Sequence, residues 1–468
     1  MKILYLSDIQ QKILQYHPVK LVYAITEQLW RIFLNKEENL ERGHRRSNRL
    51  IRCSPWICFI AMGNNSGKHH HHPPLSYKEI TKETKFKLSQ KMWQLIHLKD
   101  PMVLNSTPYP LKEHGKSFQI SFRNYIESAK LKKSKLELEL LELDLKEKTG
   151  EYPIAYKVYE YLHYAEDIRR LNLELEIKYS YLPVIRSMLI ARQLPDYDKL
   201  TLDDISAERF YQVLNLIVKI AVECDGKFTQ DKLYGLLHQE YKDSKSEDHL
   251  VSLKLDIDKV LEKLLCKDIN SSYQKLEENL KKNFLYPTYD LNPLYTTPII
   301  SHEMNGIMHY FIPSPYIFIF CTGWLFWTLS KNKIDSNHIG NALNKYILLL
   351  LNHYKEYNKI IEIIGLDDNN KESRADFIIK TENYTVIIEC KNSLGFRTPF
   401  DKNGKDLSSL FNCWNRITRS IKQCNSTKSQ LLNQKIFRLV VVNETVLGEA
   451  ATYIGFYDVN IFNKIIMI

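Results

Sequence analysis

The sequence predicts a two-part protein, with a mainly α-helical domain followed by a C-terminal α/β domain. Residues 76–290 carry Leu, Lys and Glu at the spacing of helices. Two apolar, β-branched segments within 374–392 are separated by a short polar turn, which is typical of paired strands. We therefore divide the chain into an irregular basic segment, 1–75, a helical domain, 76–290, and an α/β domain, 291–468.

The first 75 residues combine one predicted helix, a basic cluster and one apolar run. Leu21 to Leu34 has helical spacing, and five arginines gather between residues 42 and 52. These arginines suit a phosphate backbone or an ordinary solvated surface equally well. Pro55 to Met62 is apolar and strand-like.

The loop after this run, Gly63-Asn-Asn-Ser-Gly-Lys68, resembles a phosphate-binding P-loop. It departs from the pattern because Met62 takes the first glycine position and His69 takes the Ser/Thr position. Pro73-Pro74 would also prevent the helix that the motif requires. We favour a flexible loop over a nucleotide site. For the histidine tract, 69–72, we favour a polar linker over a metal site.

The helical domain carries no group of residues with recognisable chemistry of its own. We expect it to clamp substrate, to form a homodimer or to hold a partner subunit. The net charge of +10 fits a polyanion, but the diffuse lysine excess of an AT-rich genome explains it as well. Eight scattered cysteines without a CxxC pair indicate reduced thiols in a cytoplasmic protein.

No apolar run reaches the roughly 20 residues of a spanning helix, so we expect no membrane association. The most apolar stretch, Tyr316 to Leu329, is shorter, and we interpret it as a buried helix. The N-terminus lacks the arrangement of a signal peptide, which also favours a cytoplasmic location.

The α/β domain begins with a strand-turn-strand segment over 292–316, which could pack on the core that follows as an extension. An amphipathic helix is predicted next, with Ser336 or Asn337 as its N-cap. Around the strand pair, the predicted elements are a helix over 338–353, a strand over 359–365, a helix over 407–423 and a strand over 436–442. The resulting order is α-β-β-β-α-β, and residues 453–468 add one or two strands.

Two carboxylates and a lysine converge in this arrangement. Asp376 opens the first strand of the pair, whereas Glu389 and Lys391 share one face of the second strand. The intervening Cys390 points to the other face. Pairing of the strands brings Asp376, Glu389 and Lys391 to one end of the sheet. Carboxylates there suit Mg²⁺, which keeps several waters and accepts phosphate oxygens as ligands.

These residues, as D-x12-E-C-K within an α-β-β-β-α-β order, resemble the PD-(D/E)xK, or restriction-endonuclease-like, nuclease superfamily. The resemblance covers residues 290–468 and implies a mixed sheet flanked by helices. It also implies hydrolysis of nucleic acid phosphodiester bonds with Mg²⁺, for which Mn²⁺ substitutes. Asp376 and Glu389 would hold the metal, with the Cys390 carbonyl as a further ligand, and Lys391 would position or polarise the water.

Further site residues follow from the same resemblance. Asn344 stands where the first helix of the family often carries a Glu, and this departure weakens the catalytic expectation because an amide is a poorer ligand. Gln423 matches a glutamine of the second helix that faces the site. Arg397 and Lys402, in a polar loop after the motif, would contact nucleic acid. Three residues were considered as a displaced carboxylate: Glu356, Glu362 and Glu372.

The sequence therefore indicates a Mg²⁺-dependent endonuclease. Family habit favours DNA over RNA as substrate, and the resemblance suggests bacterial defence against phage or mobile elements. The alternative is a nuclease fold that has lost activity and binds nucleic acid or a partner protein. A nucleotide switch at residues 63–68 is the third hypothesis.

Overall fold

The computed structural model describes much of the chain, in two compact units that are treated separately below. The described residues are 6–34, 45–63, 77–99, 182–241, 247–267, 269–281, 292–330, 332–355, 360–365, 374–382, 384–391, 419–420, 422–429, 431, 435–442 and 456–458. The first unit comprises described residues up to 188 and from 198 to 330. The second comprises residues 189–197 and the described residues from 332 onward.

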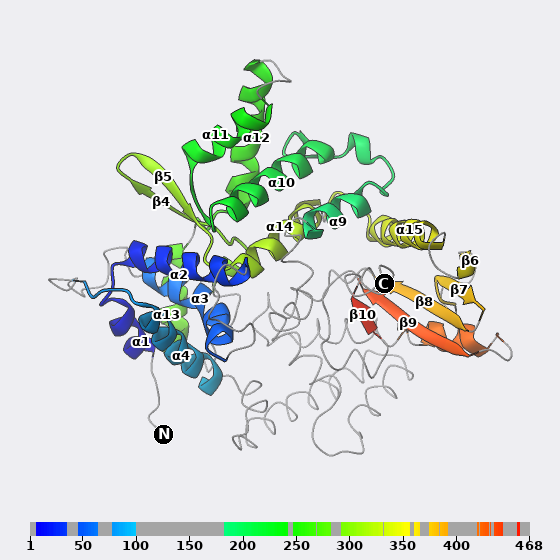
Figure 1. The fold of residues 1–468 in the computed structure, drawn as a ribbon, viewed down its shortest axis with the longest axis horizontal. Helices are drawn as coiled ribbons and strands as arrows, with labels where there is room; N and C mark the ends of the chain where they lie inside the picture. Colours follow the sequence, from blue (N-terminus) through cyan, green and yellow to red (C-terminus); the bar gives the residue numbers. More distant parts are fainter. Residues whose placement is uncertain are drawn as a thin grey trace. The chain divides into compact units, whose positions relative to one another are not determined.

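The first unit is mainly helical (Figure 1). Its helices are α1 (Leu6–Ile13), α2 (Pro18–Phe33), α3 (Arg45–Gly63), α4 (Lys82–Lys99), most of α9 (Leu182–Ala191), α10 (Ala207–Glu223), α11 (Gln230–Tyr241), α12 (Glu247–Leu264), α13 (Ile269–Lys281) and α14 (Pro315–Ser330). Short strands β1 (Thr201–Leu202) and β2 (Ile205–Ser206) form a hairpin before α10. The Ser206 side chain then caps α10 by accepting a hydrogen bond from the Arg209 N–H at 3.3 Å.

The structure corrects the prediction for residues 55–62, which are helical rather than strand-like. They form the C-terminal half of α3, where Trp56, Phe59 and Ile60 are fully or almost fully buried. Contacts with α2, α4 and α13 bury α3 from several sides, so its apolar pattern shows no helical period. Pro55 cannot donate to the Ile51 carbonyl, and the Ser54 hydroxyl supplies that hydrogen bond at 3.2 Å.

This helix also removes the strand that a P-loop requires before its glycine-rich turn. Gly63 ends α3 tightly against α13, since a Cβ placed on it would lie 2.5 Å from the Cβ of Tyr273. Close helix packing therefore accounts for this glycine. Residues 64–72, with Lys68 and the histidine tract, lie outside the described residues.

The apolar stretch at 316–329 is a helix, as predicted. It forms α14, in which Phe318, Phe326 and Trp327 are buried. Among the helices described, none has both the length and the apolar character needed to cross a bilayer.

The expected domain boundary at 290/291 differs from the division in the structure, which falls after residue 330. Strands β4 (Ile300–Met304) and β5 (Ile307–Phe311) belong to the first unit because β5 pairs with β3 (Lys227–Thr229). The sheet order is β3-β5-β4. A three-residue strand carries too little pattern for the sequence to reveal this partner.

The second unit contains α15 (Ser336–Lys355) and a five-stranded mixed sheet of order β10-β9-β8-β7-β6. The strands are β6 (Ile360–Gly365), β7 (Phe377–Thr381), β8 (Thr385–Lys391), β9 (Ile436–Val442) and β10 (Phe456–Asp458). The first three are antiparallel, whereas β8, β9 and β10 run parallel. Residues 419–420 and 422–429 are helical and precede β9. The described elements follow the predicted order, residues 407–418 of the helix predicted over 407–423 lie outside the described residues, and its described part continues to 429.

One detail of α15 differs from the prediction. Its N-terminus is capped by Asp335, whose side chain accepts the Asn337 N–H at 2.7 Å, rather than by Ser336 or Asn337.

Candidate active site

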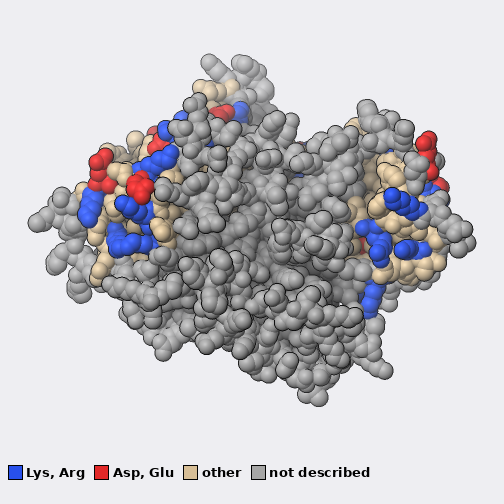
Figure 2. All heavy atoms as spheres, turned by 60° about the horizontal axis from the view of Figure 1, so that its bottom comes forward, with Lys and Arg blue, Asp and Glu red and all other residues tan. Residues whose placement is uncertain are grey.

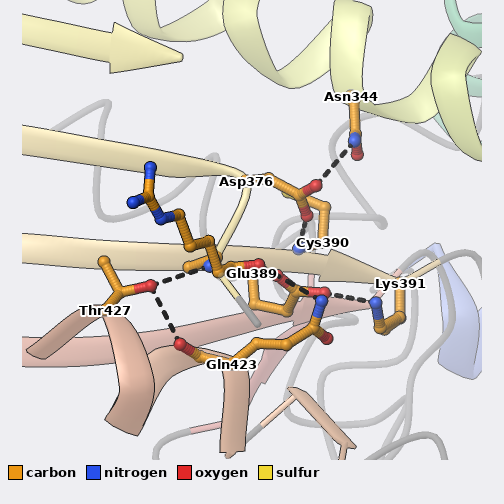
Figure 3. Close-up of polar contacts among 9 residues, drawn as sticks. Asn344, Asp376, Glu389, Cys390, Lys391, Gln423 and Thr427 are labelled. Carbon is orange, nitrogen blue, oxygen red and sulfur yellow. Dashed lines mark hydrogen bonds and ion pairs between the residues drawn. The ribbon is translucent and has the colours of Figure 1, made fainter. Parts of the chain in front are cut away.

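The strand register brings the two predicted carboxylates together. Phe377 pairs with Ile388, so the next position places Asp376 opposite Glu389 at the end of the β7–β8 ladder. The Cys390 N–H donates to Asp376 Oδ2 at 2.7 Å and holds the aspartate in place (Figure 3). Asp376, Glu389 and Lys391 therefore meet at one end of the sheet.

Glu389 is fully buried, and its two carboxylate oxygens have different surroundings. Oε1 accepts a hydrogen bond from the Lys391 ammonium group. The Lys391 side chain remains 29% exposed. Oε2 is buried and has no hydrogen-bond partner among the described residues. A buried carboxylate oxygen without a partner is costly, and either a hydrogen bond with the Asp376 carboxylate when Glu389 is protonated or a bound cation would satisfy it.

Burial raises the pKa of Glu389 to about 8, and the neighbouring Asp376 carboxylate adds to the increase. The Lys391 charge opposes both effects. Glu389 therefore stays protonated over much of the neutral pH range unless a bound metal ion displaces its proton.

Cys390 contributes its backbone N–H, rather than its thiol, to the candidate site. Burial holds the pKa of its thiol well above the ordinary value, and the Asp376 and Glu389 carboxylates raise it further. The group is thus a poor source of the thiolate that metals bind. The Cys390 carbonyl as a metal ligand stays a prediction.

Asn344 reaches the site from α15, as its place in the predicted motif implies. Its Nδ2 donates to Asp376 Oδ1 at 3.0 Å. The amide thus holds the Asp376 carboxylate in one orientation. Both Asp376 oxygens consequently accept hydrogen bonds, from Asn344 and from Cys390.

The helical segment 422–429 holds the chain just before Asp376. Gln423 Nε2 donates to the Arg374 carbonyl at 3.2 Å. Thr427 Oγ1 accepts the Ala375 N–H at 2.8 Å and donates to the Gln423 carbonyl at 2.9 Å. In Figure 3 these two residues and Asn344 come from helical segments on opposite sides of the strands. Thr427 was not among the predicted site residues, although a polar residue on the buried side of a helix is a usable signal.

Among the remaining predicted residues, the one carboxylate that the structure describes, Glu362, lies away from the site. Glu362 pairs with Lys380 at 2.8 Å, and this pair lies four positions along β7 from Asp376. Glu356, Glu372, Arg397 and Lys402 lie outside the described residues. Within the described part of the chain, no three His, Cys, Asp or Glu side chains form a group able to hold a metal ion.

The residues present nevertheless fit a magnesium-type ion. Mg²⁺ is commonly bound through one or two carboxylates, with water and substrate phosphate as its other ligands. Asp376 and Glu389 supply such a pair, and Glu389 Oε2 is the oxygen without a partner among the described residues. A Mg²⁺ or Mn²⁺ ion would offset the mutual repulsion of these carboxylates.

No protein-family model, curated protein or solved structure matches this chain. The chemistry of the site is therefore the available guide to function.

Proposed function

We propose that the second unit is a nuclease of the PD-(D/E)xK type that hydrolyses nucleic acid phosphodiester bonds with Mg²⁺, or with Mn²⁺ in its place. One observation carries this proposal. Asp376, Glu389 and Lys391 converge at the end of a mixed sheet, and one buried carboxylate oxygen there lacks a partner among the residues that the structure describes.

The residues have distinct roles in this mechanism. Asp376 and Glu389 would hold the ion, and a bound ion would supply an activated water and offset charge on the phosphate. Asn344 and the Cys390 N–H keep the Asp376 carboxylate in one orientation. The partly exposed Lys391 ammonium group would donate toward the water or the phosphate.

The substrate and biological setting follow from the family resemblance. DNA is favoured over RNA, and the role is bacterial defence against phage or mobile elements. The first unit, with its separate helical core, would clamp substrate, form a homodimer or hold a partner subunit.

The test is cleavage of plasmid, linear duplex DNA, single strands and total RNA with Mg²⁺, with Mn²⁺ and with EDTA. Asp376→Ala and Lys391→Ala are compared with wild type and with Glu362→Gln, which removes a carboxylate at a different point of the same sheet. We expect metal-dependent cleavage by wild type and the control, lost in both site variants. Cleavage that persists in Asp376→Ala would refute the proposal.

Asn344 favours a second candidate function. With an amide in place of the family acid, the fold would serve for recognition without cleavage. This alternative predicts that wild type binds nucleic acid without cutting it, and that Asp376→Asn leaves binding unchanged.

A further inference from the structure

Arg374 is an exposed cation two residues before the candidate metal ligand Asp376. Its side chain forms no hydrogen bond or ion pair with the residues that the structure describes. Because two residues of chain span at most about 7 Å, the Arg374 side chain starts from a point close to the Asp376 carboxylate. A guanidinium group in this position is available to an external anion.

The backbone that carries Arg374 is held in place by one helical segment. Gln423 Nε2 donates to the Arg374 carbonyl at 3.2 Å, and Thr427 Oγ1 accepts the Ala375 N–H at 2.8 Å (Figure 3). The next residue, Asp376, is fixed by the two hydrogen bonds to its carboxylate that are described above. Three consecutive residues are thus anchored, so the Cα of Arg374 keeps its position relative to the candidate metal ligands.

This anchoring gives Gln423 a role beyond the one that the family resemblance implies. The resemblance predicts a glutamine that faces the site, and the structure shows its amide nitrogen bound to the Arg374 carbonyl. A hydrogen bond to a backbone carbonyl fixes the position of the chain and brings no charge to a substrate. Gln423 therefore positions the residue that bears the charge.

Basic residues predominate in the second unit. From residue 332 onward, the described residues include eleven Lys and Arg and six Asp and Glu, and two of these six acids are the candidate metal ligands. Figure 2 shows Lys and Arg side chains gathered on the visible face of this unit, with acidic side chains at its margin. Such a surface attracts a polyanion, and a guanidinium group beside the site can bind one of its phosphates through two hydrogen bonds.

We infer that Arg374 binds the nucleic acid phosphate next to the one that is cleaved, and that Gln423 positions it for this contact. The inference rests on the proposed nuclease function. Successive phosphates of one strand lie about 3.4 Å apart along the axis of a duplex, so a cation this close to Asp376 meets a neighbouring phosphate. The contact adds affinity for the strand and carries no base specificity.

The experiment first measures binding without cleavage, in EDTA. Fluorescence anisotropy follows a 30-base-pair DNA duplex, one of its strands and an RNA duplex between 50 and 300 mM NaCl. Arg374→Gln is compared with wild type, with Arg374→Lys and with Lys345→Gln, which removes one exposed positive charge from α15 of the same unit. The two Gln variants lose the same net charge, so only position distinguishes them.

We expect Arg374→Gln to bind the probe that wild type binds best about three- to tenfold more weakly at 100 mM NaCl, with the slope of log K against log salt smaller by about 1. Arg374→Lys should keep the wild-type slope because it keeps the charge, and Lys345→Gln should keep it as well. Equal losses in Arg374→Gln and Lys345→Gln would indicate a net-charge effect and overturn the inference, as would no binding of any probe by wild type.

Gln423→Ala tests the positioning role through a double-mutant cycle. It should weaken binding about two- to fivefold in wild type and leave binding by Arg374→Gln unchanged, whereas its effect on thermal stability should be the same in both backgrounds. A purely structural role would change binding equally in both backgrounds, or in neither, and that result would remove Gln423 from the inference.

The two proposals fail separately. In Mg²⁺, Arg374→Gln should raise KM and change kcat little, because the contact lies outside the reacting group. Weaker binding by Arg374→Gln without any cleavage by wild type would retain Arg374 as a phosphate contact and remove the nuclease. Cleavage by wild type with unchanged binding and KM in Arg374→Gln would do the reverse.

Discussion

Replacing Glu389 with Gln should stabilise the metal-free protein at alkaline pH. The pKa of Glu389 is raised from 4.5 to about 8, first by burial and then by Asp376. A carboxyl with a raised pKa in the folded state stabilises fully below about pH 4.5, and that contribution is lost as the pH rises through about 8. The difference between these two pKa values corresponds to at most about 5 kcal/mol in the free energy of unfolding, at about 1.36 kcal/mol per pH unit. Gln cannot ionise and escapes this loss.

The assay is amide hydrogen exchange in EDTA, comparing peptides that cover β8 in wild type and in Glu389→Gln. At each pH the two proteins share the same intrinsic exchange rates, so the ratio of their observed exchange rates reports the difference in local stability. Near pH 5 the β8 amides of Glu389→Gln should be protected as well as those of wild type. Above pH 7 they should be increasingly better protected than those of wild type. Peptides from α10 serve as an internal reference, and Glu362→Gln serves as a control for removing a carboxylate from the sheet.

Added Mg²⁺ distinguishes a metal ligand from a merely buried acid. At pH 8 the ion should increase β8 protection in wild type and leave Glu389→Gln unchanged, because binding stabilises only the form that holds the ion. Equal protection of wild type and variant across pH 5 to 9 would refute the electrostatic reasoning. An equal response of both proteins to Mg²⁺ would refute the ligand assignment.

The remaining predictions test other parts of the structure. Calorimetry should show Mn²⁺ affinity rising up to about tenfold per pH unit below pH 8, with proton release, because Glu389 must ionise; a flat profile would contradict this. Asn344→Asp should increase the number of Mn²⁺ ions bound per chain, counted by electron paramagnetic resonance, whereas Asn344→Ala should not. Thr427→Val should cost about 1–3 kcal/mol in urea denaturation by leaving the Ala375 N–H without its acceptor, and Thr427→Ser should restore it. Gly226→Ala should disrupt the first unit by circular dichroism, since its Cβ would lie 2.0 Å from Trp30 Nε1, whereas Gly306→Ala, with a similar φ of 76° but open space, should cost only about 1–2 kcal/mol.

The strand pair of the second unit could be predicted because its signals are local. Strands β7 and β8 are short apolar runs with a polar turn between them, and alternation alone places Glu389 and Lys391 on one face. The place of Asn344 followed from the family motif, and its hydrogen bond to Asp376 agrees with that position. What the pattern could not supply was Thr427, whose role depends on which backbone group lies opposite it.

Predictions for the first unit failed where environment overrides pattern. The run at 55–62 is apolar on every side because several helices surround it, and an eight-residue apolar run fits a strand or a buried helix equally. The boundary expected at 290/291 differs from the division after residue 330 for another reason. Strand β5 finds its partner β3 more than 70 residues earlier in the chain, and such a pairing leaves no trace in local composition.

A purely structural account of the candidate site explains less than a functional one. A stabilising buried ion pair would place hydrogen-bond partners on both oxygens of Glu389, yet Oε2 has none among the described residues. It would also keep a second carboxylate away, whereas Asp376 lies directly opposite and raises the pKa of Glu389 further. Gln at position 389 would retain a hydrogen bond from Lys391 without the cost of ionisation. The arrangement is therefore costly when both carboxylates are ionised, and protonation of Glu389 or a bound divalent cation would each relieve the repulsion between them.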